Sequence, residues 1–289
     1  MTAIQGAASL QVRLSRVAAL GRATDCHVHV FGPADRFGYI PDRRYTPPDA
    51  TIEQYQQVAT PLGLTRLVLT APSVHGLDNS ALLEGMSTVE ASCRGVVMVG
   101  ADVDDETLQR FHEAGVRGIR TQIKASGGKP LSLDELRTLA HRVEPLGWHV
   151  EIHVDVSQLT DVDRQCSGFP VPVVIEHMGH MKTGFGIEAP GFQALVRLLR
   201  GQDAWVKLSG SYLNSIEAPP HFDVHPFVAE LIDAAPARAV WGSNWPHPHQ
   251  EPVPDDRMLL AAFVDWVDDD RVLHNLLVDN PAVLYDFSD

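Results

Sequence analysis

Two short motifs near opposite ends of the chain carry side chains that could act together on a substrate. The first is DCHVH at 25–29, and the second is WGSNWPHP at 241–248. Because alternate residues of a strand face the same side, His27 and His29 are expected to point two imidazoles into one space. Imidazoles bind metal ions and exchange protons near neutral pH. A carboxylate would be their obvious partner, but Asn244 carries an amide, so we expect chemistry without the usual acidic base.

Eight short runs of apolar and β-branched residues recur along the chain, separated by helical or polar stretches. Such alternation predicts parallel strands joined by crossover helices, and eight strands predict a (β/α)8 TIM-type barrel. A chain of 289 residues has the length of one such domain. We predict a loosely held N-terminal arm over 1–22 and a single barrel domain over 23–289. The runs cover 23–31, 66–72, 94–100, 116–122, 149–155, 172–178, 204–210 and 237–243.

The segments between these runs begin and end with helix signals. Asp, Asn or Ser precedes several of them and Gly or Pro follows, as in the turn at 132–135. The stretch 31–48, rich in Pro, Gly, Arg and Tyr, is too long for a simple connector, so we expect it to form a pocket wall or a lid. The predicted helices cover 51–62, 78–91, 104–114, 131–146, 189–200, 223–235, 256–267 and 270–286.

Composition narrows the class of protein. A formal net charge of −14 without a basic patch disfavours nucleic-acid binding. No apolar run approaches the roughly 20 residues that span a bilayer, so membrane insertion is not expected. The widely spaced Cys26, Cys93 and Cys166 suit a reducing cytoplasm, and 1–22 lacks the apolar core of a secretory signal. We expect a cytoplasmic protein that acts on a small molecule, with a homo-oligomer left open.

Polar side chains gather at the predicted strand ends, where barrel enzymes build their active sites. A third histidine and a polar side chain on the last strand strengthen the case for a site beyond the first-strand histidines alone. The set comprises His27, His29, Ser73, His75, Arg120, Gln122, His153, Glu176, His177, Lys207, Ser209, Asn244 and His247.

Several of these side chains have a structural as well as a functional explanation. Arg120 could form a salt bridge inside the barrel mouth, but an arginine facing a pocket also suits bidentate binding of a carboxylate, and we favour ligand contact. Tyr45, Ser73 and His75 could equally cap loops or contact substrate.

Other residues are predicted to be structural. Glu176 is expected to face away from its neighbour His177, because adjacent strand residues point to opposite sides. Lys207 is a candidate for a buried ion pair. Packing is expected for Trp241 and Trp245, and surface positions are expected for His112, His221, His249 and His274.

Seven blocks of the sequence, taken in order, resemble the amidohydrolase superfamily. The resemblance covers residues 22–286 and is strongest to the branch that contains 2-pyrone-4,6-dicarboxylate lactonase and related sugar lactonases. The blocks are DCHVHVFGP at 25–33, SVHGLDN at 73–79, RGIR at 117–120, GWHVEIHVD at 147–155, VVIEHMGH at 173–180, KLSG at 207–210 and VWGSNWPHP at 240–248.

The resemblance implies a distorted barrel and lactone hydrolysis that requires no metal. By position, His27, His29 and His177 would polarise the lactone carbonyl and stabilise the tetrahedral intermediate. The positions that would hold the substrate's carboxylate and ring oxygens are Tyr45, Ser73, His75 and Arg120. His153 and His247 are further candidates for substrate contact or for activating water.

This chain departs from the family pattern at the expected base and at expected arginines. Asn244 replaces an Asp, and an amide cannot take a proton from water near neutral pH. The loop 121–128 and Leu213 lack further expected arginines. Each lost charge-assisted contact typically forgoes about 1.5–3 kcal/mol. A lactone with one carboxylate, or a sugar-acid lactone, therefore fits better than a doubly anionic pyrone.

A metal ion is an alternative to the metal-free site. His27, His29, His153 and His177 could together bind zinc. The neutral Asn244, however, removes the anionic ligand that would help to hold the cation and to deprotonate its water. We therefore predict no cofactor, with zinc as the alternative.

Four functions are compatible with these observations. The first is a lactone hydrolase whose water is activated by His247 or His153. The second is a lactone isomerase, since a branch of the family carries the same Asn and a substrate hydroxyl can attack without a strong base. The third is an ordinary lactonase in which Asn244 was engineered to trap a ligand. The fourth is a catalytically silent binding protein on a barrel scaffold.

Overall fold

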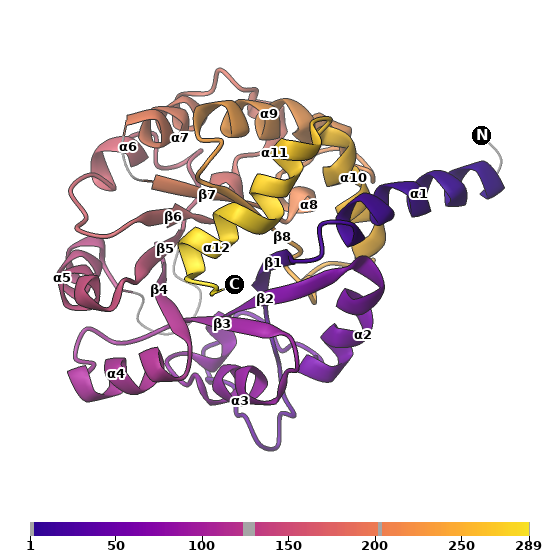
Figure 1. Ribbon diagram of the computed structural model, residues 1–289. Helices are drawn as coiled ribbons and strands as arrows, with labels where there is room; N and C mark the ends of the chain where they lie inside the picture. The colour runs from indigo at the N-terminus through magenta and orange to yellow at the C-terminus, as the bar shows by residue number, and fades with distance from the viewer. Residues whose placement is uncertain (1–2, 124–130, 202–203, 289) are drawn as a thin grey trace.

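Eight parallel strands form one sheet that curls into a nearly closed barrel, with neighbours in chain order (Figure 1). The structure is a computed structural model and describes residues 3–123, 131–201 and 204–288. Helices alternate with the strands and form the outer layer, which confirms the predicted (β/α)8 fold. The strands are β1 (Ala23–Val28), β2 (Leu64–Thr70), β3 (Ser92–Val97), β4 (Val116–Gln122), β5 (His149–His153), β6 (Val173–Ile175), β7 (Ala204–Ser209) and β8 (Ala239–Gly242).

Every predicted helical segment contains a helix. The side chain of Ser132 accepts the backbone N–H of Glu135, whose carboxylate accepts the N–H of Ser132, so the predicted start signal is a capping box. The last predicted helix is divided by a π-helical turn over Asn275–Asp279. The helices are α2 (Ile52–Leu62), α3 (Ser80–Thr88), α4 (Asp105–Glu113), α5 (Leu133–Val143), α7 (Pro190–Gly201), α9 (His225–Ala234), α10 (Asp256–Trp266), α11 (Asp270–His274) and α12 (Asn280–Tyr285).

Shorter helical turns lie in the connections between these strands and helices, several of them just after a strand. Two are single helical turns, α6 (Val162–Gln165) and α8 (Ser211–Asn214). The tighter turns cover Ser73–His75, Glu144–Leu146, Glu176–His180, Thr183–Phe185 and Phe222–Val224.

The N-terminal segment forms a helix, α1 (Ala3–Ala18), which extends away from the barrel in Figure 1. Its second half packs along α10, where Leu14 and Val17 are buried. Arg13 and Arg16 form salt bridges to carboxylates of Asp265 and Asp270 at 2.6 and 2.7 Å. These contacts hold this half of the helix against the barrel. Among the helices of the described residues, none combines the length and apolar character that a bilayer crossing requires.

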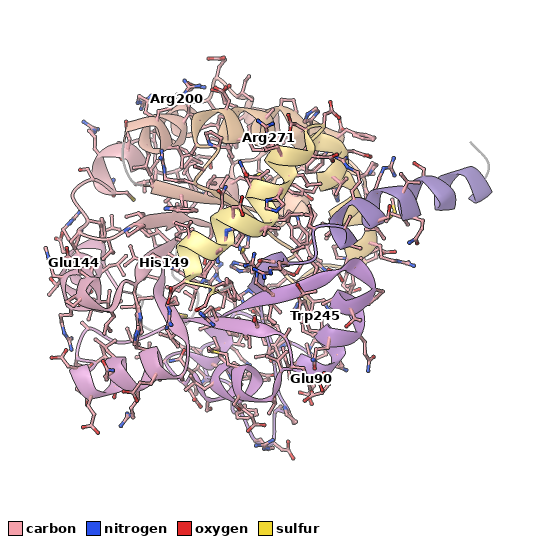
Figure 2. The ribbon with its side chains drawn as sticks, viewed as in Figure 1. Glu90, Glu144, His149, Arg200, Trp245 and Arg271 are labelled. Carbon is pink, nitrogen blue, oxygen red and sulfur yellow. The ribbon has the colours of Figure 1, made fainter. Side chains whose placement is uncertain are left out.

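One end of the barrel is covered by the C-terminal segment. Helix α12 crosses this end in Figure 1, and Tyr285 and Phe287 pack against Cys26 and Val174 inside the barrel. Charged side chains such as Glu90 extend from the outer layer into solvent (Figure 2). The opposite end, where the strands terminate, is therefore the end available for a site.

The barrel closes between β1 and β8 by an irregular pairing. Val28 bridges Trp245, and the N–H of His29 donates to the carbonyl of Trp245 at 2.8 Å. The buried carboxylate of Asp25 accepts the N–H of His27 and the N–H of Ser243, and it also accepts the hydroxyl of Tyr55 on α2. Asp25 thus joins the first strand, the last strand and the outer layer at this seam.

Asp25→Ala is expected to destabilise the protein by about 3 kcal/mol or more, because it leaves several buried donors without an acceptor. Asp25→Asn keeps an oxygen for both N–H groups and is expected to stay within about 1 kcal/mol of the parent. Urea unfolding at pH 7 measures both. Equal losses in the two variants would contradict this account of the seam.

Candidate active site

A pocket opens at the carboxyl ends of the strands, as the sequence predicts. Its cavity volume is about 200 Å³, which is room for a small molecule. The 31–48 segment contributes Arg44 and Tyr45, so the prediction of a pocket wall is confirmed. The lining residues are His29, Arg44, Tyr45, Pro72, Ser73, Arg120, Gln122, His153, His177, His180, Leu213, Asn244, Pro248 and His249.

His27, His29 and His177 converge at the floor of this pocket, which confirms their predicted proximity. The Nε2 atoms of His27 and His29 lie 3.2 Å apart, and the ring centre of His177 lies 4.6 Å from that of His27. His29 and His177 line the pocket. His27 is fully buried and lies beneath them, outside the pocket lining.

A bulge in β1 aims His27 inward. Asp25 pairs with Leu67 and Val28 with Leu69, so β1 uses one residue more than β2 over the same length. Cys26 packs in the barrel interior, and the extra residue lets its neighbour His27 also face inward. Strand β8 approaches β1 closely here, because a Cβ on Gly242 would lie 2.7 Å from the Cβ of His27. Glycine at 242 is therefore required by packing.

A buried ion pair fixes the proton positions of the HxH pair. Lys207 Nζ lies 2.7 Å from Glu151 Oε2 and 3.2 Å from His27 Nδ1, which confirms Lys207 as a buried ion-pair member. An ammonium group can only donate, so His27 accepts at Nδ1 and carries its proton on Nε2. That N–H donates to Nε2 of His29, whose Nδ1–H donates to the carbonyl of Thr70 at 2.7 Å.

Glu151 is itself held by several donors. It accepts hydrogen bonds from His149 Nε2 and the Tyr285 hydroxyl, both at 3.1 Å, as well as from Lys207. Strand β5 thus supplies the anion that balances the cation on β7. Neither ring of the HxH pair keeps a lone pair free in this arrangement.

The polypeptide after β6 follows a left-handed path, and one prediction fails because of it. His177, Met178 and Gly179 have φ of 50°, 52° and 66°, so the strand alternation ends at Ile175. Glu176 therefore lies inside the site beside His177, not on the opposite side as expected. Packing fixes the path, since a Cβ on Gly179 would lie 2.7 Å from Val156.

Glu176 forms a buried bidentate pair with Arg120. Arg120 Nε and Nη2 lie 2.7 and 2.8 Å from the Glu176 carboxylate, and Nη1 donates to the carbonyl of Ala71. Burial alone would raise the pKa of Glu176, but the Arg120 guanidinium holds it well below its usual range. Arg120 therefore forms the salt bridge that the sequence analysis gave as its structural alternative. Two of its five N–H groups remain for a substrate oxygen, so ligand contact stays a prediction.

His153 completes this group at the pocket wall. Its Nδ1 lies 3.2 Å from Glu176 Oε2 and 3.4 Å from Arg120 Nη2. A carboxylate can only accept and a guanidinium can only donate, so these two contacts exclude one another as hydrogen bonds. The shorter contact assigns the proton to Nδ1 and leaves a lone pair on Nε2. His153 and Glu176 therefore form an imidazole–carboxylate dyad that faces the pocket.

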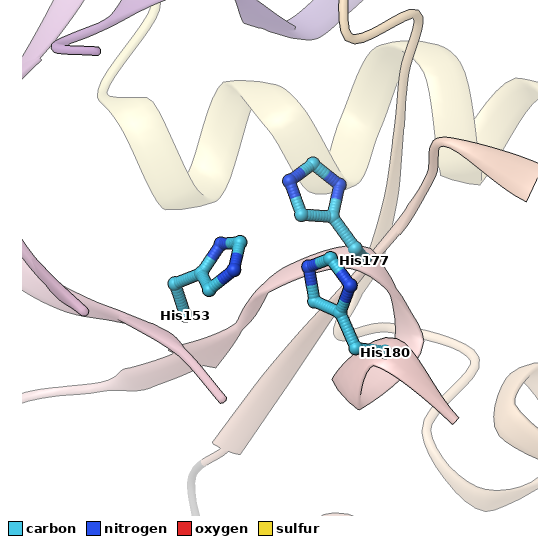
Figure 3. A group of neighbouring side chains, drawn as sticks. All are labelled: His153, His177 and His180. Atoms are coloured by element: carbon cyan, nitrogen blue, oxygen red, sulfur yellow. The ribbon is translucent and has the colours of Figure 1, made fainter. Parts of the chain in front are cut away.

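A group of three histidines fits a divalent cation. Nitrogens of His153, His177 and His180 lie within 4.8 Å of one another (Figure 3). Burial lowers the pKa of His177 well below its usual range and that of His180 to about 3, so both are neutral and able to ligate. His180 Nε2 is buried without a hydrogen-bond partner among the described residues, and Glu176 orients His153 as metal-site carboxylates do.

The four-histidine zinc set predicted from sequence is not gathered as one group within the described residues. The second group found there combines His27, Glu176 and His177. The lone pairs of His27 and His29 are already engaged by Lys207 and His27 respectively, so this pair is poorly prepared to ligate.

Two predicted substrate contacts lie behind the pocket wall. His75 is 4% exposed, and its Nδ1–H donates to the carbonyl oxygen of Gly38 at 3.0 Å. His247 is 2% exposed and is bonded at both ring nitrogens, to Tyr212 and to Asp256. In contrast, Tyr45 and Ser73 line the pocket as predicted.

The sequence analysis missed three pocket residues, His180, Arg44 and His249. His180 follows His177 at a spacing of three, a signal that the left-handed turn converts into proximity. His249 is exposed as expected, and its ring also lies edge-on against Tyr45, with the ring centres 3.8 Å apart. His221, also expected at the surface, is buried. Lys124 and the rest of the loop through 128 lie outside the described residues.

The fold and this histidine-lined pocket define an enzyme-like (β/α)8 barrel with its site at the strand ends. A family model described as Amidohydrolase matches residues 24–287. The chain belongs to the amidohydrolase family, as the sequence blocks predict.

Several characterised proteins are similar over nearly the whole chain. A 2-pyrone-4,6-dicarboxylate hydrolase of Comamonas testosteroni is 33% identical, covering 91% of this chain and 90% of that protein. A 4-sulfomuconolactone hydrolase of Hydrogenophaga intermedia is also 33% identical, covering 90% and 88%. A D-galactarolactone isomerase of Agrobacterium fabrum is 28% identical, covering 92% and 91%.

A solved structure supports the same relationship. A candidate 2-pyrone-4,6-dicarboxylic acid hydrolase of Pseudomonas putida superposes with a TM-score of 0.82 at 31% identity, covering 93% of this chain and 98% of that one.

The buried histidines make stability depend on pH. Burial and the nearby Arg120 lower the pKa of His29 to about 3. Below a pH of about 6.5, His29 therefore binds a proton in the unfolded chain but stays unprotonated in the folded protein. Stability is therefore full above this pH and is lost as the pH falls, by about 1.4 kcal/mol per unit for each such histidine.

We expect His29→Gln to reduce the slope of the unfolding free energy against pH by the equivalent of about one bound proton. Urea unfolding measured from pH 7.5 to 5 gives this slope. The control is His141→Gln, at an exposed position on α5, which is expected to leave the slope unchanged. An unaltered slope in His29→Gln would show that this ring is not kept neutral by the fold.

Proposed function

We propose that this protein is a lactone hydrolase that opens the cyclic ester of a small carboxylic acid. The observation that carries the proposal is the pocket floor of converging, neutral histidines beside the His153–Glu176 dyad. Both the relatives named as hydrolases act, by their names, on a lactone-type ring. An acyl-transfer site needs hydrogen-bond donors for the developing oxyanion and a base for water, and these groups provide both.

Donors for the carbonyl oxygen come from His177 and Arg120. His177 Nδ1 lies 2.9 Å from Ser209 Oγ, and when this hydroxyl donates, the histidine carries its proton on Nε2. Arg120 adds an N–H and a positive charge at the same wall. The Nε2–H of His27 is already donated to His29, so His27 orients that ring beneath these donors, and Lys207 holds it in this state. Preorganised donors of this kind stabilise the tetrahedral intermediate.

His153 is the proposed general base. Its Nε2 takes a proton from water as the water oxygen forms a bond to the carbonyl carbon. When the intermediate collapses, the ring C–O bond breaks, and the leaving oxygen receives that proton from the imidazolium. Glu176 keeps the ring oriented and stabilises its charged form. The product is the open-chain hydroxy acid.

The charges around the pocket favour a substrate with one carboxylate. Arg120 is neutralised by Glu176, and Leu213 offers an apolar side chain. Arg44 lines the pocket, and no carboxylate of the described residues is paired with it. One unpaired cation matches a single substrate carboxylate better than two.

Ring-size isomerisation is the second candidate, and Asn244 is the observation that favours it. The amide lines the pocket where an Asp base is usual, and the isomerase relative shows that isomerases occur among similar chains. A substrate hydroxyl would then replace water as the nucleophile. We rank it second because the hydrolase relatives are more similar.

Turnover in this proposal requires no metal. A cation held by His153, His177 and His180 would supply Lewis-acid polarisation of the carbonyl, yet it would occupy the proposed base and the proposed donor. The cytoplasmic location and a homo-oligomer remain predictions.

Hydrolysis is tested with a panel of lactones: a pyrone monocarboxylate, a sugar-acid lactone and a pyrone dicarboxylate. We expect proton NMR in H₂¹⁸O to show ring opening with one ¹⁸O per product, fastest for substrates with one carboxylate. His153→Gln is expected to lower kcat by about 100-fold or more, whereas His141→Gln leaves it unchanged. Ring-size exchange without ¹⁸O would establish the isomerase, and no reaction across the panel would reject both.

Metal removal gives a separate test. Exhaustive chelation is expected to leave kcat unchanged, and added Zn²⁺ is expected to inhibit because it occupies His153 and His177. In calorimetric titrations, the affinity for Zn²⁺ is expected to fall about 10-fold or more in His180→Asn and to change little in His29→Asn. Activity lost on chelation and restored by Zn²⁺ would overturn the metal-free proposal.

A further inference from the structure

We propose that a chain of hydrogen bonds from Asp256 through His247 and Tyr212 fixes the amide of Asn244 with its oxygen toward the pocket. Asn244 then accepts a hydrogen bond from the attacking hydroxyl group, and the three residues behind it are positioning residues. This inference rests on the proposed function, because it assigns a task to the amide in acyl transfer.

The chain connects three separate elements. Asn244 Nδ2 lies 2.8 Å from the hydroxyl of Tyr212 on α8, and that hydroxyl lies 3.0 Å from His247 Nδ1. His247 Nε2 lies 3.0 Å from Oδ1 of Asp256, the first residue of α10. Asn244 lines the pocket, whereas His247 is 2% exposed and lies behind it. The side chain of Asp256 is 12% exposed.

The acidic end determines the direction of every bond. A carboxylate accepts, so His247 carries its ring proton on Nε2 and has a lone pair on Nδ1. The Tyr212 hydroxyl then donates to Nδ1, and its oxygen accepts from the amide nitrogen of Asn244. The amide nitrogen is thus committed to the interior. Among the described residues no donor is assigned to Asn244 Oδ1, which is left for the pocket.

The opposite direction would give Asn244 the opposite role. If His247 carried a proton on Nδ1, it would donate to the Tyr212 oxygen, and the hydroxyl could donate to the amide oxygen. The NH₂ group would then face the pocket and donate to a carbonyl oxygen. The direction of the chain therefore decides whether Asn244 contacts the nucleophile or the oxyanion.

The backbone holds this arrangement in a conformation that is uncommon for residues other than glycine. Asn244 and His247 have φ of 66° and 61°. The N–H of Asn244 donates to the carbonyl of His27 at 2.9 Å, and the N–H of His247 donates to the carbonyl of Asn244 at 2.8 Å. Left-handed residues persist where surrounding contacts over-determine them, often at functional sites.

An amide oxygen orients a nucleophile but cannot remove its proton. The proton of the attacking O–H group still goes to His153, as proposed above, and Asn244 restricts the approach of that oxygen to one direction. The negative charge of Asp256 cannot serve as the base, because the amide interrupts proton transfer along the chain.

The direction is tested first without substrate. With ¹⁵N-labelled histidine, we expect His247, assigned by its loss in His247→Gln, to show a protonated Nε2 and an unprotonated, hydrogen-bonded Nδ1. Tyr212→Phe is expected to shift Nδ1 and to leave Nε2 unchanged. A protonated Nδ1 in the parent protein overturns the inference, whatever its activity.

The positioning role is tested by a double-mutant cycle. Tyr212→Phe is expected to lower kcat about 10-fold with KM within twofold, and to lower it less than twofold in the Asn244→Ala background. Tyr39→Phe is the matched control, because the Tyr39 hydroxyl has no partner among the described residues. An equal loss in both backgrounds would assign Tyr212 a merely structural role and overturn the proposal. If no lactone is turned over, the proposed function fails, and the NMR result alone decides this inference.

Discussion

The buried ion pair between Lys207 and Glu151 is the interaction on which the site depends. It places an ammonium group against one nitrogen of His27, and this single contact sets the proton positions through His29 to the backbone. Removing one partner of such a pair typically costs about 3–5 kcal/mol, since the other charge is left buried. Charged groups inside the barrel thus determine which ring nitrogens of His27 and His29 carry protons.

Burial gives this pocket polarity with little net charge. The imidazoles are neutral because desolvation and neighbouring cations lower the pKa of His27 and His29, and Arg120 is balanced by Glu176. Neutral donors and acceptors held in fixed directions can stabilise charge that appears only in the transition state. Asn244 is consistent with this principle, because its amide adds no ionised group to the pocket.

The sequence predicted the barrel and most of the pocket wall, because strand runs and strand-end polar residues follow simple periodicities. The predictions fail where the backbone is no longer a regular strand. The bulge at Cys26 and His27 keeps both inside, and the left-handed turn after Ile175 brings Glu176 and His180 into the site. Tyr212 and Asp256 could not be predicted, since their link to Asn244 depends on how two distant loops pack.

The irregular bridge between Val28 and Trp245 also bears on how the molecule is made. The two halves of the seam lie far apart in the sequence, so the first is translated well before the second. Contacts between such remote segments form late, after long loop closures. A nascent chain that lacks β8 therefore has the histidines of β1 but no closed floor beneath the pocket, and chemical competence arises only after β8 has joined β1.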